Sequence, residues 1–336
     1  MLLPGEPGNR GRLSRTALAY PDCIDAIPSS FENAHMSDAA AVSGKSLAYR
    51  FFQDIALDLS RKELKFPTFL DAALRVRLVV SKQDASSSEV AHAVRGEPLL
   101  SARVVSMANS VAVNPSGKSI TDVKNAVLMI GQNSVRSLAA SLAIAQIAQA
   151  KALEPFAEEC RQVWEHSMEV GALAFVLARR RGKVDPEEAL FAGLVHDLGH
   201  FYLLYRATQF PDVMAGDRAE LHGLIHEWHP GIGAALLQNL GMSERLVRAV
   251  DEHELRIAPV GEALTEILML ADRCSTRHGV APLPGHMRLE GEAAAESPDE
   301  EAARALLGEA GEEVRSLLDV LRGSRTSGAG AKRVPV

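Results

Sequence analysis

Residues 191–200 read FAGLVHDLGH, and this stretch decides the fold. Asp185 and Pro186 precede it as a side-chain cap and a first-turn proline, so a helix is predicted from Glu187 to about Tyr205. The segment is apolar on nearly every side, which is typical of a central, buried helix. Its exceptions are His196, Asp197 and His200. Buried polar groups need partners, so we expect other helices to supply them.

Four more polar residues occupy core-facing positions of other predicted helices, where hydrocarbon is normally buried. They are His166, His229, His253 and Asp272. His166, for example, lies in the apolar stripe of Val163, Val170 and Leu177, which follows helical spacing. Repeated exceptions of this kind suggest one shared polar site, which is either a metal site or the remains of one.

The residue types indicate divalent metal chemistry. On a helix, His196 and Asp197 project about 100° apart, so a nitrogen and an oxygen approach one cation from the same side. His166 and Asp272 would complete a mixed N/O set suited to Mn, Fe or Zn. With His229 and His253 a second ion could bind nearby. Two ions bridged by Asp197 would generate a hydroxide near neutral pH and neutralise a phosphoryl oxygen, as in metal-dependent phosphoester hydrolysis.

The alternative is a set of hydrogen-bonded core histidines, because buried polar groups are usually paired within the protein. Four histidines are assigned to such a role or to the surface: His222, His226, His278 and His286. His200 lies one turn after His196 and faces either the site or the solvent at the helix end.

Composition favours an all-α protein. The 336 residues are 47% hydrophobic and only 5% aromatic, and alternating runs rich in Val, Ile and Thr are nearly absent. The formal net charge of −7 gives no broad basic field, so nucleic acid is not expected as a partner. The short basic cluster Arg179 to Arg181, followed by Lys183, is explained by its place at a helix end.

The cysteines and the apolar stretches bear on the compartment. Cys23, Cys160 and Cys274 are widely spaced without a CxxC motif, which fits reduced thiols in a cytoplasmic protein. No stretch approaches the roughly 20 apolar residues of a membrane span, and the first residues lack a signal-like apolar block. We therefore expect a cytoplasmic protein with no membrane span.

Four regions are predicted along the chain. Residues 1–45 form a disordered leader, 46–150 an N-terminal helical lobe, 151–280 a second helical lobe, and 281–336 an acidic linker, a helix and a disordered tail. Capping boxes at Ser86 and Ser297 predict helix starts, and the last helix is expected to carry Leu307, Val314, Leu318 and Leu321. Residues 119–130 and 135–147 predict two apolar helices.

The order H, HD, D resembles the HD superfamily of phosphohydrolases, and residues 66–272 resemble the HDOD domain. The matching motifs are Phe66-Pro67, Ser88-Glu89-Val90-Ala91, Glu97-Pro98, Ala108-Asn109-Ser110, AVLMIG from Ala126, Glu165-His166-Ser167, FAGLVHDLGH, and HPGIGAALL from His229. The resemblance implies two all-helical lobes, the second of them HD-like. It also implies a non-catalytic or uncharacterised relative of the kind found in bacterial signalling proteins.

The departures from the superfamily point both ways. Many HDOD domains are degenerate at the metal positions, whereas this chain keeps all six predicted ligands. The cyclic-di-GMP phosphodiesterases carry Gly-Tyr-Pro after a His pair, but residues 251–261 read DEHELRIAPVG. A lysine that those enzymes place after HD-x-G is replaced by His200, which is therefore a candidate ligand-binding residue.

Two functions follow from these observations. The preferred one is a bacterial regulatory module that binds signalling proteins or a nucleotide ligand, and whose second lobe either retains a divalent metal site or keeps these residues in a structural role. The alternative is a metal-dependent phosphohydrolase or phosphodiesterase acting on a nucleotide.

Overall fold

The computed structural model describes residues 86–255, 257–277 and 297–323, together with a few positions between 51 and 61. The chain divides into two compact units, residues 1–61 and 62–336, which are considered separately. In the first unit the described positions from 51 to 58 are helical. In the second, every regular element of the described ranges is a helix, so the predicted all-α class is confirmed.

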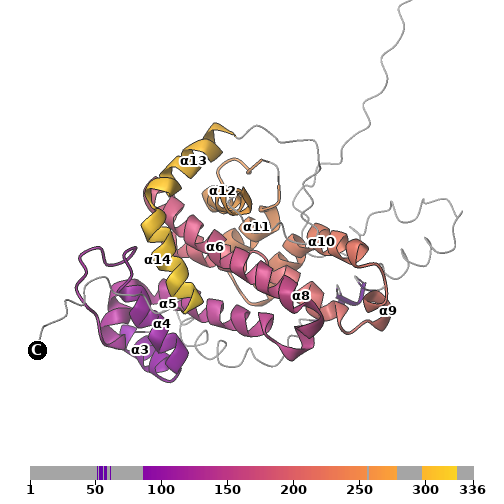
Figure 1. Cartoon of the computed structure of the whole chain (residues 1–336), viewed down its shortest axis with the longest axis horizontal. Coiled ribbons are helices and arrows are strands. Elements are labelled where there is room, and N and C mark those ends of the chain that lie inside the picture. The colour runs from indigo at the N-terminus through magenta and orange to yellow at the C-terminus, as the bar shows by residue number, and fades with distance from the viewer. Residues whose placement is uncertain are drawn as a thin grey trace, which may run out of the picture. The chain divides into compact units, whose positions relative to one another are not determined.

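The helices of residues 62–336 fall into three consecutive groups along the chain (Figure 1). The first is α3 (Ser87–Arg95), α4 (Pro98–Ala108) and α5 (Val123–Ala148). The second is η3 (Lys151–Phe156), α6 (Ala157–Arg181), α7 (Pro186–Val195), α8 (Leu198–Ala207), α9 (Pro211–Met214), α10 (Arg218–Asn239), α11 (Glu244–Glu252) and α12 (Ala263–Arg277). The third is α13 (Pro298–Glu309) and α14 (Gly311–Arg322).

The first group forms the N-terminal lobe, in which α3 and α4 pack against α5. Helix α3 begins at the predicted capping box. The Glu89 N–H donates to the Ser86 hydroxyl at 3.3 Å, and the Ser86 N–H donates to the Glu89 carboxylate at 2.8 Å. Val90 and Val94 are fully buried against the neighbouring helices. The local start signal in the sequence therefore positions an apolar face toward the core of the lobe.

Helix α5 contains the two predicted apolar helices in one run. Its start is Val123 rather than residue 119, because the Asp122 carboxylate caps it by accepting the Asn125 N–H at 2.9 Å. Gly131 interrupts the helix with φ 77° and ψ 170°. Glycine adopts such a positive φ without steric cost. The two predicted segments are therefore both present, and they join at Gly131.

Helix α5 is also the one described helix that is long and apolar enough to cross a membrane, with a mean hydropathy of 1.2 over 18 residues. No stretch of this length and hydropathy was expected from the sequence. Half of that window is buried inside the protein. Since the core helix of a soluble protein meets the same criterion, one such helix is weak evidence for a membrane span.

The second group forms the C-terminal lobe around α6 (Figure 1). Helices α7 and α12 pack directly on α6, and α10 packs on α8 and α11. The predicted stripe of Val163, Val170 and Leu177 is fully buried. Helix α6 ends at Gly182, which adopts the left-handed conformation common just after a helix.

The single helix predicted from Glu187 to Tyr205 is wrong, because the structure has two helices there. Helix α7 ends at Val195 and α8 begins at Leu198, so His196 and Asp197 form the junction. Asp197 has φ −93° and ψ 15°, outside the helical region. An offset of about 100° along one helix therefore does not describe these two side chains.

The third group packs on both lobes, because α14 contacts α4 and α6. The capping box at Ser297 is confirmed, with the Glu300 N–H donating to its hydroxyl at 3.2 Å. The single helix expected after it is two helices that meet at Ala310 and Gly311. As a result Leu317 and Val320 are fully buried, whereas the expected Leu318 is half-buried.

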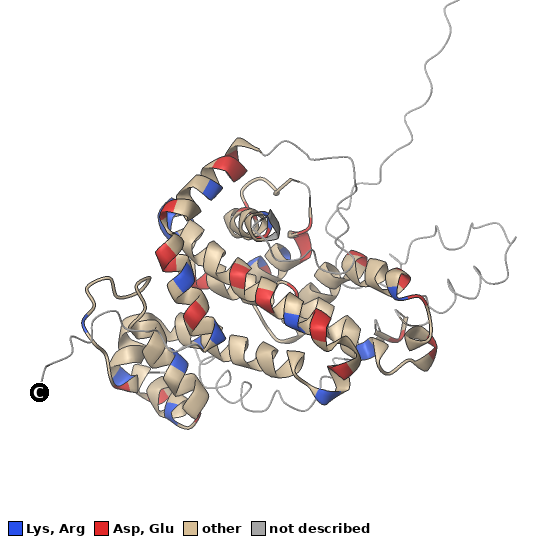
Figure 2. Ribbon diagram, in the orientation of Figure 1, with Lys and Arg blue, Asp and Glu red and all other residues tan. Residues whose placement is uncertain are grey.

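The basic cluster at the end of α6 is paired with acidic residues. Arg179 and Arg180 both contact the Glu313 carboxylate of α14, and Arg181 lies 3.2 Å from Glu266 of α12. Figure 2 shows positive and negative residues interspersed along α6, α13 and α14. This arrangement offers no continuous basic surface on these three helices.

Two of the cysteines are buried, free thiols. They are Cys160 and Cys274. Burial, together with the negative charge of Glu159, raises the pKa of the Cys160 thiol to about 12. It is therefore an unreactive core residue.

Several predictions lie outside the described residues. These are the disordered leader at 1–45, the linker at 281–296, the tail beyond 323, the Phe66-Pro67 motif, and His278 and His286. The limits 46–150 and 151–280 of the two lobes likewise remain predictions.

Candidate metal centre

Two glycines of the FAGLVHDLGH stretch allow the helices around it to approach closely. A Cβ atom on Gly193 would lie 2.5 Å from the Cα of Gly171 in α6. A Cβ on Gly199 would lie 2.0 Å from the carbonyl oxygen of His229 in α10. No side chain fits at either distance. The glycines thus bring α6 and α10 against the His196-Asp197 junction from two sides.

The structure brings together all six residues predicted as metal ligands. They are His166 of α6, His196 and Asp197 of the junction, His229 of α10, His253 at the end of α11, and Asp272 of α12. All six are at most 9% exposed. Five separate segments therefore bring imidazoles and carboxylates into one buried cluster, which we call the pocket, while the metal-binding role itself stays a prediction.

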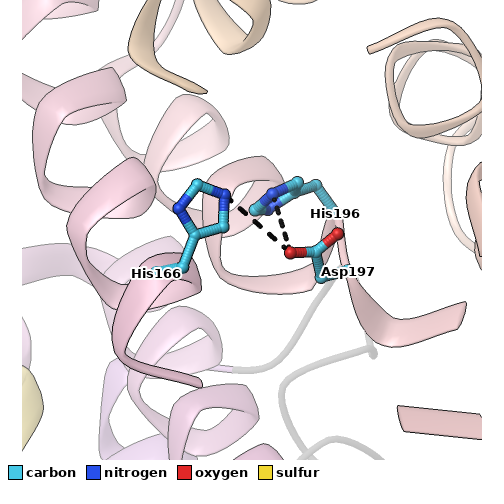
Figure 3. Close-up of side chains that lie close together, drawn as sticks. All are labelled: His166, His196 and Asp197. Atoms are coloured by element: carbon cyan, nitrogen blue, oxygen red, sulfur yellow. Dashed lines mark ion pairs between the residues drawn. The ribbon is translucent and has the colours of Figure 1, made fainter. Parts of the chain in front are cut away.

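His166, His196 and Asp197 form the first triad (Figure 3). Asp197 Oδ2 lies 3.2 Å from His196 Nε2 and 3.9 Å from His166 Nε2. Asp272 adjoins the triad, with its Oδ1 atom 2.9 Å from His166 Nε2. The first triad with Asp272 thus offers two nitrogens and two carboxylates.

Asp197, His229 and His253 form the second triad. The other oxygen of Asp197, Oδ1, lies 3.3 Å from His229 Nε2. His229 Nε2 in turn lies 3.3 Å from His253 Nε2. Asp197 therefore belongs to both triads and presents one oxygen to each.

The hydrogen bonds at the far side of three imidazoles fix their tautomers. The Nδ1 atoms of His196, His229 and His253 lie 2.8, 2.9 and 2.6 Å from backbone carbonyl oxygens. A carbonyl oxygen only accepts, so each Nδ1 carries a proton and donates it. In the neutral form of each ring, Nε2 is then left with a lone pair directed at the other five residues, which is the usual orientation of a metal-ligating histidine.

These lone pairs face one another. His229 Nε2 and His253 Nε2 both need a cation or a proton between them at 3.3 Å. Both oxygens of Asp197 are buried without a hydrogen bond of normal geometry, although imidazole nitrogens lie 3.2 and 3.3 Å away. Buried acceptors directed at each other are unfavourable unless a proton or a metal ion lies among them. The residues therefore fit divalent metal ions, and their N/O donors suit Mn, Fe or Zn.

The pKa values agree with a pocket built for cations. Burial lowers the pKa of His196, but the negative charge of Asp197 outweighs it and raises the value to about 9. Burial raises the pKa of Asp197, but the opposing charge of His196 holds it well below its usual range. Burial and the charges of His196 and His229 lower the pKa of His253 to about 3. Without metal, the proton on His196 supplies positive charge beside Asp197.

His200, the predicted ligand-binding residue, faces a neighbouring cluster. It is fully buried, so it does not point to solvent. Its Nε2 atom lies 3.1 Å from Glu159 Oε1, and Glu159 Oε2 lies 3.1 Å from His222 Nε2. The rings of His200 and His229 are 5.8 Å apart. His222 is hydrogen-bonded as expected, and a ligand-binding role for His200 stays a prediction.

Two carboxylates near the pocket were missed in the sequence analysis. Glu159 lies seven residues before His166, which places both on the same face of α6, and this spacing was a usable signal. Glu254 directly follows His253 and lies 3.8 Å from His229 Nε2. It falls just outside α11, where no helical periodicity marks it.

The described helices define an all-α protein with a buried cluster of imidazoles and carboxylates. Residues 66–255 match the family model of the HDOD domain. Since this stretch is more than half of the chain, the protein belongs to the HDOD domain family. No match is found among the curated proteins.

Solved structures share the fold. A Shewanella amazonensis protein described as a "putative metal-dependent phosphohydrolase" superposes with a TM-score of 0.63 at 22% identity, over 82% of this chain and 99% of its own. An HDOD domain protein with unknown function from Geobacter sulfurreducens gives 0.56 at 21%, over 82% and 97%. At such identities the likeness shows a common fold.

Proposed function

We propose that this chain is a regulatory HDOD module of bacterial signalling whose C-terminal lobe binds divalent cations and, through them, a phosphate-bearing ligand such as a nucleotide. The observation that carries the proposal is the convergence of lone pairs at His229 and His253. Their Nε2 atoms lie 3.3 Å apart while both Nδ1 atoms are committed to backbone carbonyls. Two buried imidazole nitrogens at this distance need a proton or a metal ion between them, and a divalent ion would satisfy both of them together with Asp197.

The regulatory part of the proposal is supported by the family match, which includes the N-terminal lobe as well as the HD-like lobe. The first lobe, with α14 packed against both lobes, offers a surface for signalling proteins. The buried free thiols Cys160 and Cys274 support a cytoplasmic setting.

A metal-dependent phosphohydrolase acting on a nucleotide is the second candidate. It is favoured by Asp197, which directs Oδ2 to the first triad and Oδ1 to the second. In this reading His166, His196, Asp197 and Asp272 would hold one ion, and Asp197, His229 and His253 would hold the other. When bound, such a pair of ions supplies an activated water near neutral pH and neutralises charge on a phosphoryl oxygen.

Metal content and turnover separate these candidates. The full chain, purified without chelator, is expected to contain Mn, Fe or Zn, and the Asp197→Ala variant is expected to lose it. Asp212→Ala, which removes an exposed carboxylate of α9, serves as the matched control and should keep it. Bound metal without hydrolysis of nucleotides or nitrophenyl phosphoesters supports the module, and hydrolysis abolished by Asp197→Ala supports the enzyme. A wild-type chain that binds no divalent metal contradicts both.

A further inference from the structure

We propose that Glu254 is a fourth protein ligand of the cation held by the second triad. The inference rests on the proposed metal binding and assigns a residue that lies outside the six predicted ligands. Glu254 follows His253 in the turn after α11, so its carboxylate reaches the pocket from the segment that already supplies one imidazole.

The distances around the second triad are those of a coordination shell. Glu254 Oε1 lies 3.8 Å from His229 Nε2 and 3.9 Å from His253 Nε2. His229 Nε2 lies 3.3 Å from both His253 Nε2 and Asp197 Oδ1, and the ligand atoms of the second triad all lie within 4.8 Å of one another. Donors at about 2.1 Å from a tetrahedral ion are about 3.4 Å apart. The four separations that involve His229 or Glu254 with an imidazole bracket this value, so small shifts would let one ion contact Glu254 together with the two histidines.

Charge balance favours the same assignment. The first triad has its own carboxylate in Asp272, 2.9 Å from His166, in addition to its share of Asp197. The second triad has two neutral imidazoles and only the other oxygen of Asp197. A divalent ion there would be poorly neutralised in a buried site. Glu254 gives the second triad the carboxylate that Asp272 gives the first.

Exposure places Glu254 on the solvent side of the second triad. The side chains of Asp197, His229 and His253 are at most 1% exposed, whereas that of Glu254 is 31% exposed. The buried donors thus surround the ion from within the lobe, and Glu254 closes the shell from outside. A carboxylate in this position can be replaced without opening a cavity in the core.

The test is titration of the metal-free full chain with Mn²⁺, followed by calorimetry and by the electron paramagnetic resonance of free and bound Mn²⁺. Wild type is expected to bind two ions. Glu254→Gln is expected to weaken one site by at least about 10-fold and to leave the other unchanged. Glu252→Gln is the matched control, because the Glu252 carboxylate lies near the charges of Arg248 and Glu262. This variant is expected to leave both metal sites intact.

A further variant separates ligation from charge alone. Glu254→His is expected to keep the second ion, because a neutral imidazole is a ligand, whereas a purely electrostatic role would not be rescued. If Glu254→Gln binds two Mn²⁺ ions with wild-type affinity, or if Glu254→His does not restore the affinity of the second site, the inference is overturned and the proposed function still stands. Absence of any Mn²⁺ site in wild type would instead overturn the proposed metal binding, and this inference with it.

Discussion

Replacing Gly199 with alanine is expected to force α8 away from α10 and to disrupt the metal centre. The new Cβ would lie 2.0 Å from the carbonyl oxygen of His229 and 2.6 Å from the amide nitrogen of Gly233. Both are backbone atoms, so no side-chain rotation relieves the overlap. The two helices must therefore move apart, and two donors of the second triad move with them: Asp197, directly before α8, and His229 in α10.

The magnitude follows from these distances. Contacts of a Cβ atom below 3.0 Å are essentially never seen, so the helices must separate locally by about 1 Å. Overpacking typically lowers the free energy of unfolding by about 1–3 kcal/mol. A clash with backbone atoms, which cannot rotate away, is expected to cost about 3 kcal/mol or more. For a unit of this size the melting temperature should fall by about 6–12 °C. Since metal sites tolerate errors of only about 0.2 Å in ligand distance, affinity at the second triad should fall as well.

Thermal unfolding followed by circular dichroism, together with Mn²⁺ titration, measures both effects. Gly223→Ala is the matched control, since Gly223 lies in the same helix α10 and a Cβ there would have no heavy atom of another segment within 4 Å. This control should be stabilised by up to about 1 kcal/mol through helix propensity. If Gly199→Ala melts at the wild-type temperature and binds Mn²⁺ normally, the close packing of α8 on α10 is not what positions the site.

Three further predictions follow from the packing and the titrating groups. The Cβ of Gly193→Ala would lie 2.5 Å from Gly171 Cα, so this variant should lower the free energy of unfolding by about 3 kcal/mol in urea titrations. An unchanged free energy would show that α6 and α7 are not in this contact. The pKa of metal-free His196 is raised to about 9, so a metal ion must displace its proton and metal affinity should fall as pH decreases from 9 to 6. Calorimetry in buffers of different ionisation enthalpy should detect the released proton. Metal binding without proton release would argue against His196 as a ligand. Burial raises the pKa of Glu187 from 4.5 to about 7, so the folded state holds this proton more tightly than the unfolded state. The free energy of unfolding should therefore fall by about 1–3 kcal/mol as pH rises from 4.5 to 7. In urea denaturation Glu187→Gln should remove this pH dependence, and an unaltered pH dependence would refute the assignment.

The helical class and the six clustered residues could be predicted because their signals are local. His166 interrupts a buried stripe whose other members follow helical spacing, and a polar exception on such a stripe is visible in one sequence. That these exceptions lie together could be inferred because an unpartnered buried polar group is costly.

The rest depends on contacts between distant segments. The junction at His196 and Asp197 was missed because α7 and α8 are apolar on almost every side, so no change of periodicity marks the break. Glu254 was missed because it lies beyond the end of α11 and interrupts no stripe. The contact of Gly199 with His229 joins residues 30 positions apart, and a lone glycine does not name its partner.

The most direct test of the account is an anomalous difference map from crystals of the full chain grown with Mn²⁺. The account predicts two peaks on either side of Asp197, one among His166, His196 and Asp272 and the other among His229, His253 and Glu254. A map with no peak beside Asp197, in a structure where the surrounding imidazoles are held only by hydrogen bonds, would contradict metal binding at this centre.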